Sequence, residues 1–438
     1  MRFPNTPVDT SRDKKYEAKA IFRNTSWLLV DRLLRMSVGL FIGLWLARYL
    51  GSENFGIYSY AIAFSGLFQS LSTLGLESIA IRDIVREPSK SGEILGTVFS
   101  LQLIGGLISL LLVIGTIIGL RPNETLTHWI VIIVAAKIPL NAFSTFDIWF
   151  QSQCQSKYTV CVKLFVFILV SALKVIAINA HAPLVIFAWV FLLESILFSA
   201  GIGLAYKLVL ERYTPLWAAS VARAKTLLSS SWSLLVSEVV IMVYMRIDQI
   251  MIKEFLGNSE VGIYSLAIRF TEIWYFIPIA IVNSIFPAII LLRETDELAY
   301  KKRLQQLYKI VTWVSLSIVL GTQFLAKYLI VFSLGQDYTE SATILSITIW
   351  VIVFASQGIA RGKWLVMENL QSYAFMYIGI GGLCNVSLNY LWIPIYGLKG
   401  AALATILSQA VVAIFAPMLF RKTRPSSFML IKAFTPLY

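Results

Sequence analysis

Eleven ionisable side chains lie inside long apolar stretches of this 438-residue chain, where a charge needs a partner or a wet cavity. Arginine and lysine there suit an anionic ligand such as a phosphate, and a buried carboxylate can carry a proton. The pattern predicts a cation-lined cavity with carboxylates as candidates for ion coupling. The six cations are Arg32, Arg35, Lys137, Lys174, Arg246 and Arg269. The five anions are Asp31, Glu194, Glu238, Asp248 and Glu272, with Asp147 near the end of another apolar stretch.

Some of these charges can satisfy each other on their own helix. Asp31 and Arg35 are four residues apart, and Arg269 and Glu272 are three apart, so each pair shares one helix face. The alternative interpretation of such pairs is structural, because a buried ion pair can hold two helices in register.

Other charges have no partner within one helical turn. Lys137 and Lys174 lack a nearby carboxylate on their own helix, and Glu194 and Glu238 lack a nearby cation. The two glutamates are therefore candidates for ion coupling. The alternative is that they pair with Lys137 or Lys174 across helices.

Signatures of enzymes and metal sites are missing from the sequence. It contains no nucleophile elbow, phosphate-binding P-loop or HExxH pattern, so we predict no catalytic residue, no metal and no cofactor. The three cysteines do not have the spacing of metal ligands, and we expect them to be small buried hydrophobic residues; they are Cys154, Cys161 and Cys384. We therefore expect a protein that is not an enzyme.

The elements that must position the charges are membrane-spanning helices. The composition is 58% hydrophobic and 14% charged, which is far from that of a soluble domain. A span needs about 20 apolar residues, and the apolar stretches provide twelve. They lie near 26–49, 55–77, 94–119, 129–148, 160–179, 184–206, 231–252, 261–290, 306–331, 341–360, 373–393 and 399–420. Pro139, Pro278 and Pro287 fall inside spans and should interrupt helical hydrogen bonding.

The net charge of +13 follows membrane topology, since the basic residues lie in short runs between the apolar stretches. Cytoplasmic segments collect lysine and arginine. With the N-terminus inside, 26 of the 37 basic residues fall in inner segments and five in outer turns. This bias predicts that both termini are cytoplasmic, and it leaves no basic face for nucleic acid.

An internal repeat divides the chain. Residues 50–64 read LGSENFGIYSYAIAF and residues 256–270 read LGNSEVGIYSLAIRF, with nine identities in fifteen positions. Each copy directly follows the first span of its half. Because each half has six spans, both halves enter the membrane from the same side and are parallel repeats. The predicted parts are an N-terminal segment at 1–25, a six-helix bundle at 26–206, a linker at 207–230, a second bundle at 231–420 and a tail at 421–438.

Three stretches resemble the polysaccharide transporter group, the Wzx-type flippases of the multidrug/oligosaccharidyl-lipid/polysaccharide (MOP) superfamily. They are ARYLGSENFGIYSYAIAF, preceded by DRLLR in the same helix; LGQDYTESATIL; and NYLWIPIYGLKGAALATILSQ. The resemblance implies an all-α integral membrane fold of twelve helices in two pseudo-symmetric six-helix bundles, like the MATE transporters, with a central cavity and alternating access.

The same resemblance implies a substrate and partners. The substrate would be an undecaprenyl-diphosphate-linked oligosaccharide of O-antigen or a related polysaccharide, moved across the bacterial inner membrane. Membrane lipids, a polysaccharide polymerase and a chain-length regulator would be the partners. Arg35 and Arg269 are the best candidates to hold the head group, because flippases of the superfamily place arginines in the opening helices of each half.

Three other functions are alternatives. The first is a lipid II flippase of the same superfamily, but such flippases usually have two additional helices, for which this chain has no room. A multidrug or organic-cation antiporter of the same superfamily would need acidic and aromatic cavity walls, whereas the cations found here suit an anionic head group. A membrane-embedded sugar polymerase predicts a long outer loop, but every outer turn is about 15 residues or shorter.

Overall fold

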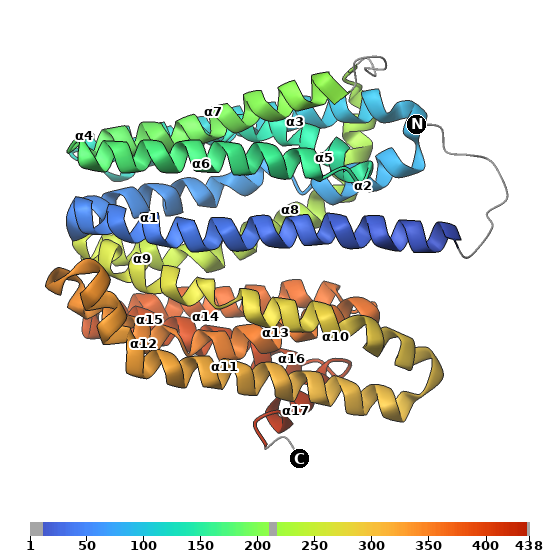
Figure 1. Ribbon diagram of the computed structural model, residues 1–438. Helices are drawn as coiled ribbons and strands as arrows, with labels where there is room; N and C mark the ends of the chain where they lie inside the picture. Colours follow the sequence, from blue (N-terminus) through green and yellow to red (C-terminus); the bar gives the residue numbers. More distant parts are fainter. Residues whose placement is uncertain (1–11, 210–216, 436–438) are drawn as a thin grey trace. The chain divides into compact units, whose positions relative to one another are not determined.

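The computed structural model describes residues 12–209 and 217–435 as helices joined by short turns, with no strand among them (Figure 1). For residues 12–34, and for Ser37, Glu294 and Asp337, only the backbone is described. The predicted site residues Asp31 and Arg32 therefore lie in a helix, but their side chains are outside the described residues.

The helices follow one another along the chain with few residues between them. The first part contains α1 (Arg12–Thr73), α2 (Glu77–Arg86), α3 (Ser91–Leu120), α4 (Thr125–Ala135), α5 (Thr145–Ser152), α6 (Lys157–Asn179) and α7 (Leu184–Val209). The second part contains α8 (Val221–Phe255), α9 (Asn258–Ile273), α10 (Phe276–Thr295), α11 (Glu297–Leu334), α12 (Thr339–Thr348), α13 (Val351–Met367), α14 (Ser372–Tyr396), α15 (Leu398–Ala410), α16 (Ala416–Met418) and α17 (Arg424–Lys432).

Ten helical segments in the described part of the chain are long and apolar enough to cross a membrane. They coincide one for one with the last ten predicted spans, from Pro88–Leu120 to Leu398–Met418. The first predicted span lies in α1, which is divided by a kink at Gly51, and the second continues past the end of α1 at Thr73 to the first residue of α2. The prediction of an all-helical integral membrane fold is confirmed.

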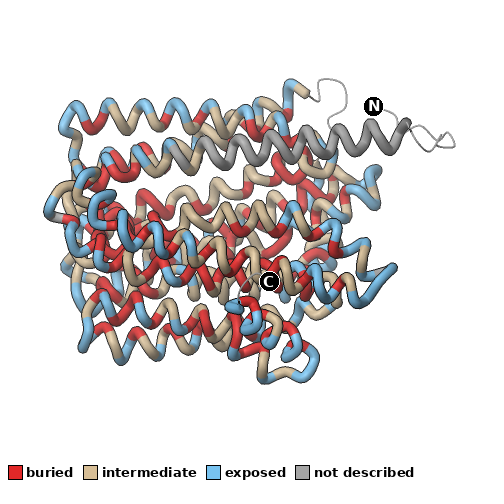
Figure 2. The backbone as a smooth tube through the Cα atoms, turned by 60° about the horizontal axis from the view of Figure 1, so that its bottom comes forward, coloured by how far each residue is buried: buried red, intermediate tan, exposed pale blue. Residues whose placement is uncertain are grey.

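The helix faces that point away from the protein are apolar. Large hydrophobic side chains are exposed along α3, α6 and α11, among them Leu111, Phe165, Phe324 and Phe332. Figure 2 shows exposed residues recurring along the helices between buried ones. Water would penalise so much exposed apolar surface, whereas lipid tails accept it.

Two of the three prolines interrupt a span as predicted. Proline removes a hydrogen bond and its ring clashes with the carbonyl four residues earlier. Helix α4 ends at Ala135, four residues before Pro139, and a 3-10 helix follows over Pro139–Ser144. The backbone also leaves the helix between α9 and α10, four residues before Pro278. Pro287, in contrast, lies inside the continuous helix α10.

Helices α12 and α13 form one span that is broken at a point where the sequence has no proline. Helix α12 ends at Thr348 and α13 begins at Val351. This is the fourth span of the second half, and the Pro139 break interrupts the fourth span of the first half. Broken helices at corresponding positions of two repeats are typical of transporters, where they line binding sites.

The chain forms two compact units. Unit 1 consists of residues 1–42, 71–112 and 136–235, and unit 2 of residues 43–70, 113–135 and 236–438. The core of unit 1 packs α2, α3, α5 and α7 around side chains such as Ile84, Val98 and Phe150. Helices α6 and α7 lie side by side in Figure 1. The predicted division of the sequence at 207–230 stays a prediction.

The core of unit 2 packs α10, α11, α13, α14 and α17 around side chains such as Leu304, Tyr308 and Tyr377. The predicted tail contributes to this core, because Leu430 and Ala433 of that segment are fully buried.

Both copies of the sequence repeat have the same backbone conformation. Gly51 has φ 72° and ψ 170°, and Gly257 has φ 105° and ψ −173°. Positive φ with ψ near 180° is open essentially to glycine alone. The matching glycines therefore turn the chain in the same way in each copy.

The two copies also pack against each other, within unit 2. A side-chain carbon at Gly56 would clash with the backbone oxygen of Asn258, and one at Gly262 would clash with that of Ser52. Residues 52 and 56 correspond to residues 258 and 262 in the repeat, so the contact is reciprocal. Ser259 Oγ donates to Ser52 Oγ at 2.8 Å across the same contact. Only glycine permits two helices to approach this closely.

Candidate functional site

Unit 1 contains a cavity of about 240 Å³ that brings predicted site residues together. Arg35 of α1 and Lys137, next to the Pro139 break, line it with Lys163 of α6 and Glu194 of α7. Three cations and one carboxylate therefore surround this space. The broken helix matters here because the 3-10 turn places Asn141 and other residues along the cavity wall.

The other charges of unit 1 are arranged across helices. Lys174 Nζ lies 3.4 Å from Glu194 Oε2, which is the cross-helix pairing considered as the alternative for Glu194. Lys163 Nζ lies 3.1 Å from Asp147 Oδ2, and Thr159 donates to the same carboxylate at 2.7 Å. Lys137 Nζ lies 4.5 Å from the centre of the Phe191 ring, a cation–π distance.

Unit 2 holds the two remaining predicted cations, Arg246 of α8 and Arg269 of α9, both partly buried. The Arg269 guanidinium lies 5.6 Å from the Phe55 ring centre. A side-chain carbon at Gly43 would clash with Arg269 Nη1, so Gly43 provides the room for this arginine. Arg269 and Glu272 form no ion pair in the described part of unit 2.

A second cavity, of about 430 Å³, lies inside unit 2. Two predicted carboxylates line it, Asp248 of α8 and Glu272 of α9. The interrupted spans α9–α10 and α12–α13 border it through residues such as Tyr275 and Val351. The third predicted carboxylate of this unit, Glu238, lies partly buried on α8 outside the lining.

Asp248 sits in a compact group of oxygen atoms. Asn389 Nδ2 donates to its Oδ1 at 2.7 Å, and the hydroxyls of Thr405 and Tyr264 donate to its Oδ2 at 2.8 and 3.0 Å. Asn389 Nδ2 also donates to Asn385 Oδ1 at 3.0 Å. The side-chain oxygen of Asn389 is buried with no hydrogen-bond partner. The carboxylate, hydroxyl and amide oxygens of this group are ligand types that a hard cation prefers.

Arg361 is a functional candidate that the sequence analysis missed. The predicted span near 341–360 ends just before it, whereas α13 continues to Met367 and Arg361 is only 2% exposed. Its side chain lines the cavity of unit 2. Gly362 and Lys363 interrupt the apolar run directly after Arg361, so the predicted span is shorter than the helix.

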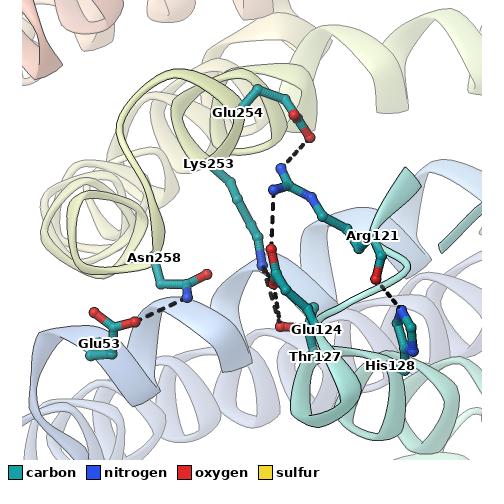
Figure 3. Close-up of polar contacts among 8 residues, drawn as sticks. All are labelled: Glu53, Arg121, Glu124, Thr127, His128, Lys253, Glu254 and Asn258. Carbon is teal, nitrogen blue, oxygen red and sulfur yellow. Dashed lines mark hydrogen bonds and ion pairs between the residues drawn. The ribbon is translucent and has the colours of Figure 1, made fainter. Parts of the chain in front are cut away.

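A polar network at one end of unit 2 joins residues that are distant in sequence (Figure 3). Lys253 Nζ lies 2.7 Å from Glu124 Oε2, and Arg121 Nη1 lies 3.1 Å from Glu124 Oε1. Arg121 also contacts Glu254. Nearby, Asn258 Nδ2 donates to Glu53 Oε1 at 3.0 Å.

Glu124 is the centre of this network. Burial raises the pKa of its carboxyl group, but hydrogen bonds from Lys253 and Thr127 and the charges of Lys253 and Arg121 outweigh that effect. They hold the pKa below its ordinary value of 4.5. The carboxylate is therefore ionised over the whole physiological range.

Comparison with known proteins places these features in a family. The family model described as "Polysaccharide biosynthesis protein" matches residues 21–293. A Haloferax volcanii protein named "Probable flippase AglR" is 31% identical over 186 residues, which are 40% of this chain and 37% of that protein. The Staphylococcus aureus "Capsular polysaccharide biosynthesis protein CapF" is 24% identical over 38% of this chain and 43% of its own length. The alignments thus span about two fifths of these relatives.

Solved structures share the fold over nearly the whole chain. A lipid II flippase, MurJ, superimposes with a TM-score of 0.74 at 16% identity, covering 92% of this chain and 90% of the other. An inward-facing MATE multidrug transporter of the MOP superfamily gives 0.69 at 16% identity, covering 92% and 96%. At such identities the likeness establishes the fold, and the site has to be argued from its own residues.

Proposed function

Because the chain belongs to the polysaccharide biosynthesis protein family and has the MOP-superfamily fold, we propose that it is a lipid-linked oligosaccharide flippase. Its substrate is an undecaprenyl-diphosphate-linked repeat unit of O-antigen or a related surface polysaccharide. It moves this substrate from the inner to the outer leaflet of a bacterial inner membrane. Both termini are cytoplasmic, and a polysaccharide polymerase and a chain-length regulator act on the product.

The observation that carries this proposal is the cavity of unit 1. Three of its lining residues, Arg35, Lys137 and Lys163, are cationic, and Glu194 is its one lining carboxylate. A diphosphate head group is a compact anion that arginine binds through paired N–H donors and lysine as a point charge. Arg35 is the expected main contact, with Arg269 of α9 as the second candidate arginine.

Ion coupling is assigned to Asp248. The oxygen group around it carries one negative charge, which matches one monovalent cation, a proton or sodium. The unpartnered oxygen of Asn389 supports this assignment, because a bound cation would accept it as a ligand. Glu194 is the weaker coupling candidate, since Lys174 already lies beside it.

Alternating access requires one end of the protein to close while the other opens. The network around Glu124 and the reciprocal contact of Gly56 with Gly262 join the same end of unit 2. Arg121 and Lys253 follow the predicted spans 94–119 and 231–252, at the ends expected to face outside when the N-terminus is cytoplasmic. We therefore assign this group, which we call the outer seal (residues 52–56, 121–127 and 253–262), to closing the outer side.

An organic-cation antiporter is the second candidate, and the cavity of unit 2 favours it. Asp248 lines that cavity together with Tyr244, Tyr264 and Tyr275, and acidic and aromatic walls suit organic cations. Arg361 in the same wall disfavours a cationic ligand, so the flippase remains the leading proposal.

Deleting the gene in its native host tests the proposal. Lipid-linked repeat units should accumulate on the inner leaflet, and surface polysaccharide should disappear. Complementation with R35Q or K137Q should restore export poorly at matched protein level, whereas R303Q, a change at an exposed arginine of α11, should restore it fully. Normal surface polysaccharide with altered drug tolerance would instead support the antiporter.

A further inference from the structure

Arg361 is a buried cation without a carboxylate. It lies in the middle of α13, and 2% of its surface is exposed. Its Nη2 donates to the backbone oxygen of Val412 at 2.8 Å. Its Nη1 is buried with no hydrogen-bond partner, and the described residues place no acidic group within ion-pair distance of it.

The backbone segment that accepts the hydrogen bond from Arg361 has an unusual conformation. Val412 lies in a π-helix over Val411–Phe415, between α15 and α16. Single π-turns inside α-helices are rare and are found mostly at functional sites, because they rearrange the local hydrogen bonds. The contact holds the guanidinium in place, and the Tyr377 ring supports it with its centre 5.4 Å from Cζ. The other terminal nitrogen, Nη1, has no hydrogen-bond partner among the described residues.

The space beside Arg361 is open. Gly358 and Gly362 both line the cavity of unit 2, and a side-chain carbon added to either would meet nothing within 4 Å. The surrounding wall is mainly apolar, formed by side chains such as Ile241, Ile268 and Leu365. Two carboxylates, Asp248 and Glu272, also line this cavity, and Asp248 accepts hydrogen bonds from three neutral groups. Under the proposed function, a cation bound at Asp248 balances its charge.

We propose that the cavity of unit 2 is a binding site for a phosphate group on a hydrophobic chain, with the phosphate held by Arg361 and the chain by the apolar wall. A guanidinium with a free N–H supplies the charge-assisted hydrogen bond that a phosphate oxygen needs. The apolar wall makes a lipid phosphate a better occupant than free phosphate. The source of such a ligand, the lipid carrier, rests on the proposed function, but the binding can be measured without transport.

The test uses the full-length protein in nanodiscs and three probes: farnesyl phosphate, farnesol and inorganic phosphate. Farnesyl phosphate should bind at least about tenfold tighter than farnesol, because the alcohol lacks the charged oxygens that accept a hydrogen bond from the guanidinium. Inorganic phosphate should not displace it at equal concentration. Equal binding of farnesyl phosphate and farnesol, or tight binding of inorganic phosphate alone, would overturn the proposal.

Variants separate this site from a structural role. R361M should bind the phosphate and the alcohol alike while the ligand-free protein melts at the same or a higher temperature, because a buried unpaired charge is removed. R361K should keep part of the preference, and R303Q all of it. A purely structural arginine predicts the opposite, a lower melting temperature with the preference intact.

A second variant keeps the test valid if R361M folds poorly. G362L fills the open space beside Arg361 and leaves the charge, so farnesyl phosphate should bind at least about tenfold more weakly. Unchanged binding in G362L would contradict the site. Loss of this site would leave the flippase function standing, whereas normal export in the deletion strain would remove the flippase function and leave the binding result intact.

Discussion

At the scale of single residues, charged side chains within the described helices include two contrasting kinds. Lys174 with Glu194, and Lys163 with Asp147, neutralise each other across neighbouring helices. Asp248, in contrast, lines a cavity and is held by neutral donors, which leaves its charge available to a cation. The division follows from the membrane, where an ionised side chain is stable only beside an opposite charge, a polar group or a wet space.

Replacing Asp248 with asparagine should uncouple transport from its ion gradient. The substitution keeps the shape and removes the charge that balances a bound cation. Translocation of a lipid-linked oligosaccharide into proteoliposomes should lose its response to an imposed proton or sodium gradient. E297Q, at an exposed ion pair of α11, serves as the control and should respond like the unmodified protein. A full gradient response in D248N would exclude Asp248 from coupling.

Replacing Glu124 with glutamine should weaken the outer seal. Lys253 is buried and would lose the carboxylate that it contacts at 2.7 Å, so the free energy of unfolding should fall by about 1.5–3 kcal/mol. Because the folded-state pKa of Glu124 is depressed, its contribution is present above pH 4.5 and is lost as the pH falls through the lower folded value.

Thermal unfolding at several pH values checks this prediction. The difference between the unmodified protein and E124Q should be constant at neutral pH and shrink only below pH 4.5. A difference that disappears between pH 6 and 8 would show that another group controls the seal.

At the scale of elements, the two glycines in each copy of the repeat have different structural roles, which the shared sequence motif does not reveal. Gly51 and Gly257 adopt a positive φ that turns the chain, whereas Gly56 and Gly262 allow two helices to pack closely. The sequence pattern indicated a tight turn at each place. It contained no sign that the two turns face each other, because the contact joins residues more than 200 positions apart.

Gly56→Ala should destabilise the packing of α1 against α9. The added carbon meets backbone atoms of Asn258, which have little freedom to move, so a cost of about 1–3 kcal/mol is expected. Gly115→Ala is the matched control, because a carbon there meets nothing within 4 Å. The two melting temperatures in detergent should differ clearly, and equal values would show that the contact is looser than described.

At the scale of the whole molecule, the outer seal should open once in every transport cycle. Ser52 Oγ and Ser259 Oγ lie 2.8 Å apart across it, so cysteines at both positions should form a disulfide on mild oxidation. The background should lack the three native cysteines, which are free thiols. Export should stop on crosslinking and return on reduction, while either single cysteine should export throughout. Export by the crosslinked protein would show that the seal stays closed during transport.

The sequence by itself determined the class of fold and most of its spans. Apolar length is a local property, so ten spans were located correctly, and Pro139 and Pro278 were correctly predicted to interrupt helices. Most charged residues of the two cavities are also evident from the sequence, because a charge in an apolar run is visible without tertiary information; Lys163 and Arg361 are the exceptions.

Only the tertiary structure decided how those residues are combined. Glu194 could pair with Lys137 or Lys174, and the packing of α6 against α7 selected Lys174. Arg361 entered the candidate site only when α13 proved to continue past it. Which charges pair and which side chains are buried depend on contacts between helices that are distant in sequence. A single sequence does not show which helix faces pack together.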